Sequence, residues 1–260
     1  MPDQSGIFYT DNGSGIPVVF LHGFCETHQI WQSFSSSLSE NYRVICLDLP
    51  GFGQSKLLPT GFSIADVASN VISFLKGLKV ESCVLVGHSL GGYVTLEMAH
   101  QQPEFVNGFC LFHSTAYPDS EEKKISRNKV IEFVTKNGVR PFTESFIPPL
   151  FYVQTNEQIA TVVKMASNTP LETLIAYVKS MRDRPDRTNV LREFAKPILF
   201  IAGEKDAGIS VESVQKQADL AQKATLLTLP NVAHMGMFEN KQRTLGKVNE
   251  FLQDRLADFL

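Results

Sequence analysis

The sequence predicts an α/β protein built on a mostly parallel, doubly wound sheet of about eight strands, with helices on both faces and a helical cap insertion. Three observations predict this fold class. Short apolar runs alternate with amphipathic stretches, as in a parallel sheet covered by helices. The runs are continuously apolar, which is typical of strands buried on both faces. The interval 115–189 breaks this alternation and contains helical patterns instead.

Seven apolar runs are the clearest strand candidates, at residues 7–10, 18–22, 43–48, 82–86, 106–112, 197–202 and 224–229. The first two flank the turn-forming segment 11–15 (D-N-G-S-G), which predicts an N-terminal hairpin. The clearest helix begins at Ser63, a good N-cap with Asp66 three residues later, and ends near Gly77. A second helix is expected at 92–102.

The interval 115–189 is expected to form the cap. Helical patterns cover 121–136, 157–166 and 171–181, and prolines between them punctuate the helices, at positions 141, 148, 149 and 170. The interval is too short and too interrupted for an independent core. We therefore predict an α/β core formed by 1–114 and 190–260, with 115–189 inserted as a helical cap between strands 6 and 7.

Composition excludes several function classes. The chain has 260 residues and a net charge of −3 without any run of Lys or Arg, which argues against nucleic acid as a partner. No apolar stretch approaches the roughly 18 residues of a membrane helix, so no membrane insertion is expected. Residues 1–15 are polar and do not resemble a signal peptide. Three of the four cysteines lie in apolar runs, which favours a reducing compartment. A cytoplasmic location is expected, and the sequence predicts no particular oligomeric state.

The pentapeptide 87–91 (G-H-S-L-G) is the strongest local signal for chemistry. A serine at a sharp turn between a strand and a helix has a strained backbone, and glycines two residues away on either side avoid collisions there. The apolar run 82–86 leads directly into the motif and a helical pattern leaves it. Ser89 is therefore the candidate nucleophile of an enzyme.

A serine hydroxyl needs a general base, and the base needs a group that orients it. Of the six histidines, His234 follows the last expected strand in a loop, where open parallel sheets bind their ligands. The expected strand 106–112 ends at His113, which could line the pocket. The remaining four have structural or solvated roles in this interpretation: His22, His28, His88 and His100.

Asp206 is the candidate acid, because it follows the expected strand 197–202 and precedes His234 by one strand. Glu204 is the main competitor, but it lies very close to the end of that strand. Asp183 and Asp186 belong to an arginine-rich stretch and are interpreted as solvated charges. The chain order Ser, Asp, His follows from these choices.

With these motifs in place, nearly the whole chain resembles the α/β-hydrolase fold superfamily, in particular serine esterases and lyases with a helical cap. The segment 18–24 (V-V-F-L-H-G-F) is similar to the family's strand followed by H-G-x, and 48–55 (D-L-P-G-F-G-Q-S) to its D-x-P-G-x-G-x-S loop, which is structural. The resemblance implies an oxyanion hole formed by the backbone N–H groups of Phe24 and Leu90. It implies no cofactor and no metal, since an acyl-enzyme route needs neither. Relatives of this fold that carry out other chemistries have an aspartate nucleophile at the position of Ser89. The serine therefore argues against those chemistries for this chain.

The expected function is that of a serine hydrolase, a carboxylesterase cleaving small to medium uncharged acyl esters through a Ser89 acyl-enzyme. Phe146 and Phe151 are candidate pocket residues in the cap, beside His113, and no charged anchor for a substrate is identifiable. Alternatives that keep the machinery are a C–C bond hydrolase of ring-cleavage products, a thioesterase and a cofactor-free perhydrolase. Basic residues reaching Ser89 would favour the C–C hydrolase. A ligand-binding receptor on an esterase fold is a further alternative.

Overall fold

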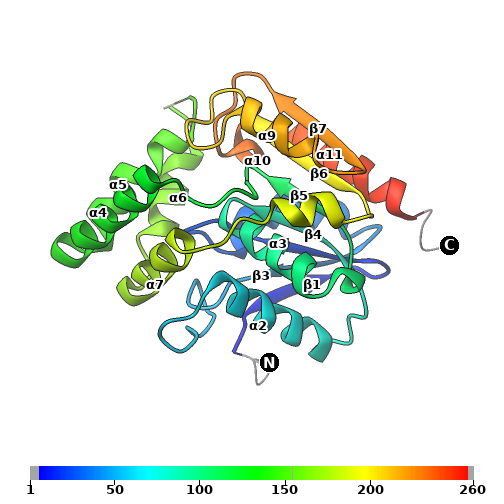
Figure 1. The fold of residues 1–260 in the computed structure, drawn as a ribbon, viewed down its shortest axis with the longest axis horizontal. Coiled ribbons are helices and arrows are strands. Elements are labelled where there is room, and N and C mark those ends of the chain that lie inside the picture. Colours follow the sequence, from blue (N-terminus) through cyan, green and yellow to red (C-terminus); the bar gives the residue numbers. More distant parts are fainter. Residues whose placement is uncertain (1–5, 154, 257–260) are drawn as a thin grey trace.

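A computed structural model describes residues 6–153 and 155–256, and these residues form one sheet surrounded by helices (Figure 1). The sheet has seven strands, in the order β1-β3-β2-β4-β5-β6-β7. β1 is antiparallel to β3, and every other pair is parallel. The strands are β1 (Tyr9–Asn12), β2 (Pro17–Leu21), β3 (Arg43–Leu47), β4 (Cys83–His88), β5 (Val106–Phe112), β6 (Ile198–Gly203) and β7 (Ala224–Leu229). The mostly parallel sheet is confirmed, with seven described strands instead of about eight.

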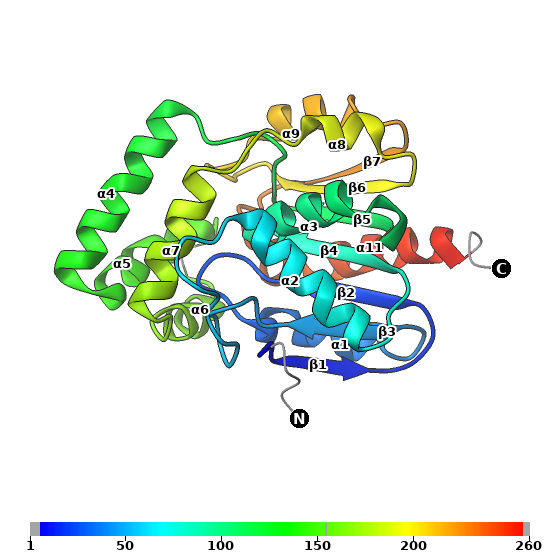
Figure 2. The same ribbon diagram turned by 60° about the horizontal axis from the view of Figure 1, so that its bottom comes forward.

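Helices cover both faces of the sheet, as the doubly wound fold class requires (Figure 2). One face carries α2 (Ile64–Gly77), α3 (Leu90–Gln101), α8 (Thr188–Glu193) and α9 (Val211–Ala218), and the other carries α1 (Gln32–Leu38) and α11 (Lys241–Leu256). Short elements complete the chain: η1 (His28–Trp31), η2 (Pro103–Phe105) and α10 (Gly236–Glu239). None of the described helices is long and apolar enough to cross a membrane.

The N-terminal hairpin predicted from the sequence is wrong. β1 pairs with β3, with Tyr9 opposite Leu47, and makes no ladder with β2. The reason lies in the sheet order, because β2 is already paired on one side with β3 and on the other with β4. No edge of β2 is left for β1, which therefore takes the free edge of β3.

The helix α2 confirms the expectation from its capping residues. The Ser63 hydroxyl accepts a hydrogen bond from the Asp66 N–H at 3.2 Å, and the Asp66 carboxylate accepts one from the Ser63 N–H at 2.8 Å. Each bond satisfies a backbone donor that the first turn leaves without a partner. The helix ends at Gly77, as expected, and buries Val67 and Val71 against the core.

Four cap helices lie together beyond one end of the sheet in both views (Figures 1 and 2). They are α4 (Glu121–Asn137), α5 (Val139–Phe146), α6 (Gln158–Ala166) and α7 (Leu171–Arg182), with the turn η3 (Pro148–Leu150) between α5 and α6. They follow β5 and precede β6, so the insertion comes after the fifth strand and not after the sixth. α5 was not expected, because Pro141 suggested a break. Pro141 is the third residue of α5, where its missing N–H would have no acceptor within the helix.

The core is continuous across the sheet, and the four cysteines are part of it. Cys25, Cys46, Cys83 and Cys110 are all buried and free. Burial raises the pKa of the Cys46 thiol to about 12. These thiols therefore behave as small apolar side chains, as expected from the apolar runs around them.

Candidate active site

Ser89 occupies a sharp turn between β4 and α3. Its backbone has φ 49° and ψ −111°, a conformation that side-chain-bearing residues rarely adopt. The two flanking glycines make the turn sterically feasible. A Cβ atom at Gly87 would overlap the carbonyl of Gly91, and a Cβ atom at Gly91 would overlap the carbonyl of Leu21. Hydrogen bonds from the Ser89 N–H to the Phe112 carbonyl, at 3.0 Å, and from the Ser114 hydroxyl to the Ser89 carbonyl, at 2.7 Å, hold the strained residue in place.

His234 and Asp206 are joined by a short hydrogen bond, 2.6 Å between His234 Nδ1 and Asp206 Oδ2. Asp206 lies in the loop after β6 and His234 in the loop after β7, at the carboxyl ends of adjacent strands. The other carboxylate oxygen of Asp206 accepts hydrogen bonds from the N–H groups of Gly208, at 2.9 Å, and Ile209, at 3.1 Å. Both oxygens are therefore occupied, and the carboxylate presents a fixed face to the imidazole.

The electrostatics of this pair keep Asp206 ionised. Burial alone raises the pKa of a carboxyl group, but the charge on His234 and the neighbouring imidazoles outweigh it and hold the pKa of Asp206 well below its usual range. For His234, burial acts to lower the pKa, and the Asp206 carboxylate outweighs it, so the pKa lies above the ordinary 6.5. The pair can therefore hold a proton on His234 Nδ1 and stabilise an imidazolium.

His113 is not a wall residue of the pocket, contrary to the expectation from its position after β5. It is fully buried, and its Nδ1 lies 3.5 Å from the same Asp206 oxygen that binds His234. Burial lowers the pKa of His113 to about 4 against the raising effect of Asp206, so the ring is neutral. The three side chains bring ligand atoms close enough for a metal ion. A metal there would have to break the 2.6 Å hydrogen bond, and we assign none.

A cavity of about 410 Å³ opens above Ser89 and is lined by Asp206 and His234 as well. Its walls are mainly apolar and come from the core and the cap helices, including Phe24, Tyr93, Phe142, Phe146, Leu150 and Met181. Phe146 is one of the pocket candidates from the sequence, and it lines this cavity. Phe151 does not line this cavity: it is buried and stacks with Phe238 at 6.3 Å between ring centroids.

Two backbone N–H groups are the candidate oxyanion donors, one directly after Ser89 in the chain and one in the loop after β2. Leu90 is the first residue of α3, so its N–H has no acceptor within the helix. The Phe24 N–H donates no backbone hydrogen bond within the described residues, and the Phe24 side chain lines the cavity. These are the two donors that the family resemblance implies.

A buried pair beneath the site was missed by sequence reasoning. His88 Nδ1 lies 2.9 Å from Glu26 Oε2, which also accepts the Gly23 N–H at 2.6 Å. His88 Nε2 donates to the carbonyl of His234, at 3.0 Å, because a carbonyl can only accept. Burial acts to raise the pKa of Glu26, but the neighbouring His88 and His22 and the hydrogen bond from the Gly23 N–H together outweigh it and lower that pKa. The pair thus ties the loop after β2 to the loop that carries His234. The histidine in the motif 87–91 is the available signal, and the sequence alone indicates only a structural or solvated role for it.

The cap is also tied to the His234 loop. The His234 N–H donates to the Leu150 carbonyl at 2.9 Å. The Glu239 carboxylate accepts the Tyr152 N–H at 2.6 Å and the Ala233 N–H at 2.9 Å. Neither link has a signature in the sequence, because Leu150 and His234, like Tyr152 and Glu239, are far apart along the chain.

Two basic side chains line the cavity, although no charged anchor was identifiable from the sequence. They are Lys123 and Arg127 on α4. The structure corrects this, because α4 turns one face toward the cavity.

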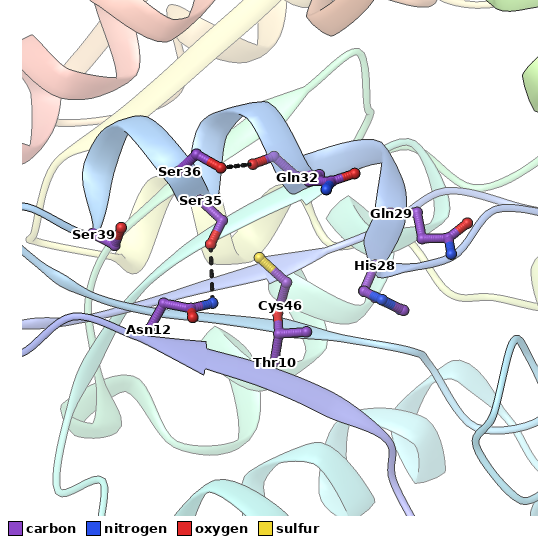
Figure 3. Close-up of a pocket in the computed structure, with 9 residues that line it drawn as sticks. All are labelled: Thr10, Asn12, His28, Gln29, Gln32, Ser35, Ser36, Ser39 and Cys46. Atoms are coloured by element: carbon purple, nitrogen blue, oxygen red, sulfur yellow. Dashed lines mark hydrogen bonds between the residues drawn. The ribbon is translucent and has the colours of Figure 1, made fainter.

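A second hollow, of about 390 Å³, lies between β1, β3 and α1 (Figure 3). Its lining is polar and includes Asn12, Ser35 and Ser36. Asn12 donates to Ser35 at 3.4 Å and Ser36 to the Gln32 carbonyl at 2.9 Å. Its histidine, His28, pairs with Asp48 at 2.7 Å. Asp48 also accepts the Gln54 N–H at 3.0 Å, which agrees with a structural role for the loop 48–55.

Comparisons with known proteins agree with this architecture. The chain is 27% identical over 246 residues to the dihydrolipoyllysine-residue acetyltransferase component of the acetoin cleaving system of Pseudomonas putida, covering 92% of this chain and 64% of that longer one. It is 22% identical over 250 residues to 2-(acetamidomethylene)succinate hydrolase of Mesorhizobium japonicum, covering 93% and 90%. Its structure resembles a malate-bound thermophilic esterase of Thermogutta terrifontis, with a TM-score of 0.91, 29% identity and coverage of 96% and 93%. Residues 18–246 match the family model of the alpha/beta hydrolase family, and the chain therefore belongs to that family.

Proposed function

We propose that this hydrolase is a serine carboxylesterase that cleaves esters with small to medium acyl groups. One observation carries the proposal: the strained Ser89 and the hydrogen-bonded pair of His234 and Asp206 line the same largely apolar cavity. This combination of nucleophile, base and orienting acid is what acyl transfer to a serine requires. The relatives support the coarser activity, since one is named a hydrolase and another an esterase.

In the proposed mechanism, Ser89 Oγ attacks the ester carbonyl while His234 Nε2 takes the hydroxyl proton. The negative charge that develops on the carbonyl oxygen is stabilised by the N–H groups of Phe24 and Leu90. The C–O bond to the alcohol then breaks, and His234 returns its proton to the leaving alkoxide. Water, deprotonated by His234, attacks the acyl-enzyme and releases the carboxylic acid with Ser89 restored. Asp206 holds the imidazole tautomer throughout.

The direct test is hydrolysis of p-nitrophenyl acetate, butyrate, octanoate and palmitate. The rate is measured from the absorbance of the p-nitrophenolate that is released. We expect saturable turnover with the highest kcat/KM for a short or medium chain, because the cavity of about 410 Å³ is bounded by the core on one side and by the cap helices on the other. No turnover on any of the four esters by the folded protein would contradict the proposal.

The pH dependence of kcat/KM should report the pKa of the general base. His234 must be neutral to accept a proton, and Asp206 raises its pKa above 6.5. Activity should therefore be lost as the pH falls through a value above 6.5, whereas a base of unperturbed pKa would lose it at 6.5. The profile is measured between pH 4 and 9 with p-nitrophenyl butyrate, corrected for spontaneous hydrolysis. An acidic limb near 4 would instead assign the base to His113, whose pKa is about 4.

Carbon–carbon bond hydrolysis is a second candidate, and one observation favours it. The cavity is lined by Lys123 and Arg127, and β-diketone-like ring-cleavage products carry carboxylates that basic side chains would bind. The same serine and backbone donors would serve that reaction. Turnover of a vinylogous diketone acid, with none on simple esters, would select this candidate over the esterase.

A further inference from the structure

The cap helix α4 turns a basic face toward the cavity. Lys123, Ser126, Arg127 and Val130 all line it, and their spacing of three, four and seven residues places them on one side of the helix. The orientation is therefore a property of the helix and not of a single extended side chain.

Lys123 lacks a counter-charge within the part of the chain that the structure describes. Among the described residues no carboxylate forms an ion pair with its ammonium group, whereas the adjacent Lys124 pairs with Glu121 at 2.7 Å. Asp206 is the only carboxylate among the described residues that line the cavity, and it is bound to His234. The ammonium of Lys123 is thus free to bind an anion within the cavity.

The surroundings of Lys123 add positive charge. Arg127 and Arg184 share one buried carboxylate, Asp119, at 3.0 Å and 2.7 Å. Two guanidinium groups on one carboxylate leave one net positive charge, and Lys123 adds a second. The positive charge of Lys123 is close enough to His234 to act on it, and it acts to lower the pKa of that imidazole. The cation and the reacting centre therefore line the same cavity.

We propose that Lys123 forms a carboxylate-binding subsite, and that the substrate is an ester that also carries an ionised carboxylate. Half-esters of short dicarboxylic acids are the simplest members of this class. The apolar wall, including Phe142 and Phe146, faces their methylene chain, and Lys123 binds the far carboxylate. This differs from the uncharged acyl group expected from the sequence, and it rests on the proposed esterase function for the bond that is cleaved.

The test compares monoethyl and diethyl esters of succinic, glutaric and adipic acids by pH-stat titration at low ionic strength. The diester reports ester cleavage without the anionic group. We expect the ratio of kcat/KM for the best half-ester over its diester to fall about 10- to 100-fold in Lys123→Met, the range typical of a lost hydrogen bond to a charged group. The ratio cancels any change in the pKa of His234, because both substrates use the same base. Lys124→Met is the matched control, since Lys124 pairs with Glu121 and does not line the cavity, and it should keep the wild-type ratio.

Binding provides a readout that does not depend on turnover. In a Ser89→Ala background, calorimetry with the half-ester should show weaker binding after Lys123→Met by a similar factor. An unchanged ratio together with unchanged binding would overturn the subsite and leave the esterase function intact. Absence of ester cleavage with binding that still depends on Lys123 would overturn the esterase function and support the subsite.

Discussion

Replacing Ser89 by alanine should lower kcat for p-nitrophenyl butyrate by about 10⁶-fold, by analogy with the loss of the nucleophile in a well-studied serine hydrolase. The reason is that the acyl-enzyme cannot form, while the cavity and the backbone donors remain. Rates should be measured with enough protein to detect the remaining hydrolysis, beside a mass spectrum after treatment with a fluorophosphonate. The wild type should gain one phosphonyl group and the variant none.

The control for this variant is Ser36→Ala. Ser36 is exposed on α1 in the polar hollow of Figure 3, and its hydroxyl donates to the Gln32 carbonyl. It should keep wild-type activity and fluorophosphonate labelling. Substantial activity in Ser89→Ala, together with loss of activity in Ser36→Ala, would refute the mechanism. Ser36 does not line the cavity that contains His234 and Asp206.

Replacing Asp206 by asparagine should lower kcat by about 10⁴-fold with the fold intact, as in other triads. An amide keeps an oxygen for the N–H groups of Gly208 and Ile209, so the loop after β6 should hold its shape. It cannot stabilise the imidazolium of His234, and its NH₂ group favours the wrong tautomer. Because Asp206 raises the pKa of His234, that pKa should fall in the variant. Kinetics, thermal unfolding and NMR titration of the His234 ring measure the three effects.

Glu204→Gln is the matched control, because Glu204 was the competing acid and lies two residues away on the same loop. Its side chain is exposed, and the structure gives it no bond to His234. Turnover within about twofold of the wild type is expected. A large loss there, with a near-normal rate in Asp206→Asn, would reassign the acid to Glu204.

Much of the architecture could be predicted because its causes are local. Continuous apolar runs become buried parallel strands, and the pair Ser63 and Asp66 begins α2 wherever the helix packs. The glycines around Ser89 report a steric requirement of the turn itself. The positions of Asp206 and His234 after strands β6 and β7 place them at the same edge of a parallel sheet, which is why both could be nominated as site residues.

Other features could not be predicted because they depend on which segments meet. The edge chosen by β1 depends on the pairing of β2, and α5 depends on where Pro141 falls within a turn. His113 follows a strand as His234 does, yet packing buries it behind Asp206, where its pKa falls to about 4. The sequence placed His113 only as a pocket candidate, and the packing decides that it does not line the cavity.

By itself, the sequence determined the α/β class, the strained turn at Ser89 and the position of the candidate acid and base, since each follows from short-range sterics or from strand order. Only the tertiary structure decided what surrounds them. The partners of His88, the bond between the His234 loop and Leu150, and the orientation of Lys123 toward the cavity all join segments distant in the chain. The sequence gives the charge of a side chain. Whether that side chain is paired, buried or free to bind a substrate depends on the elements packed against it.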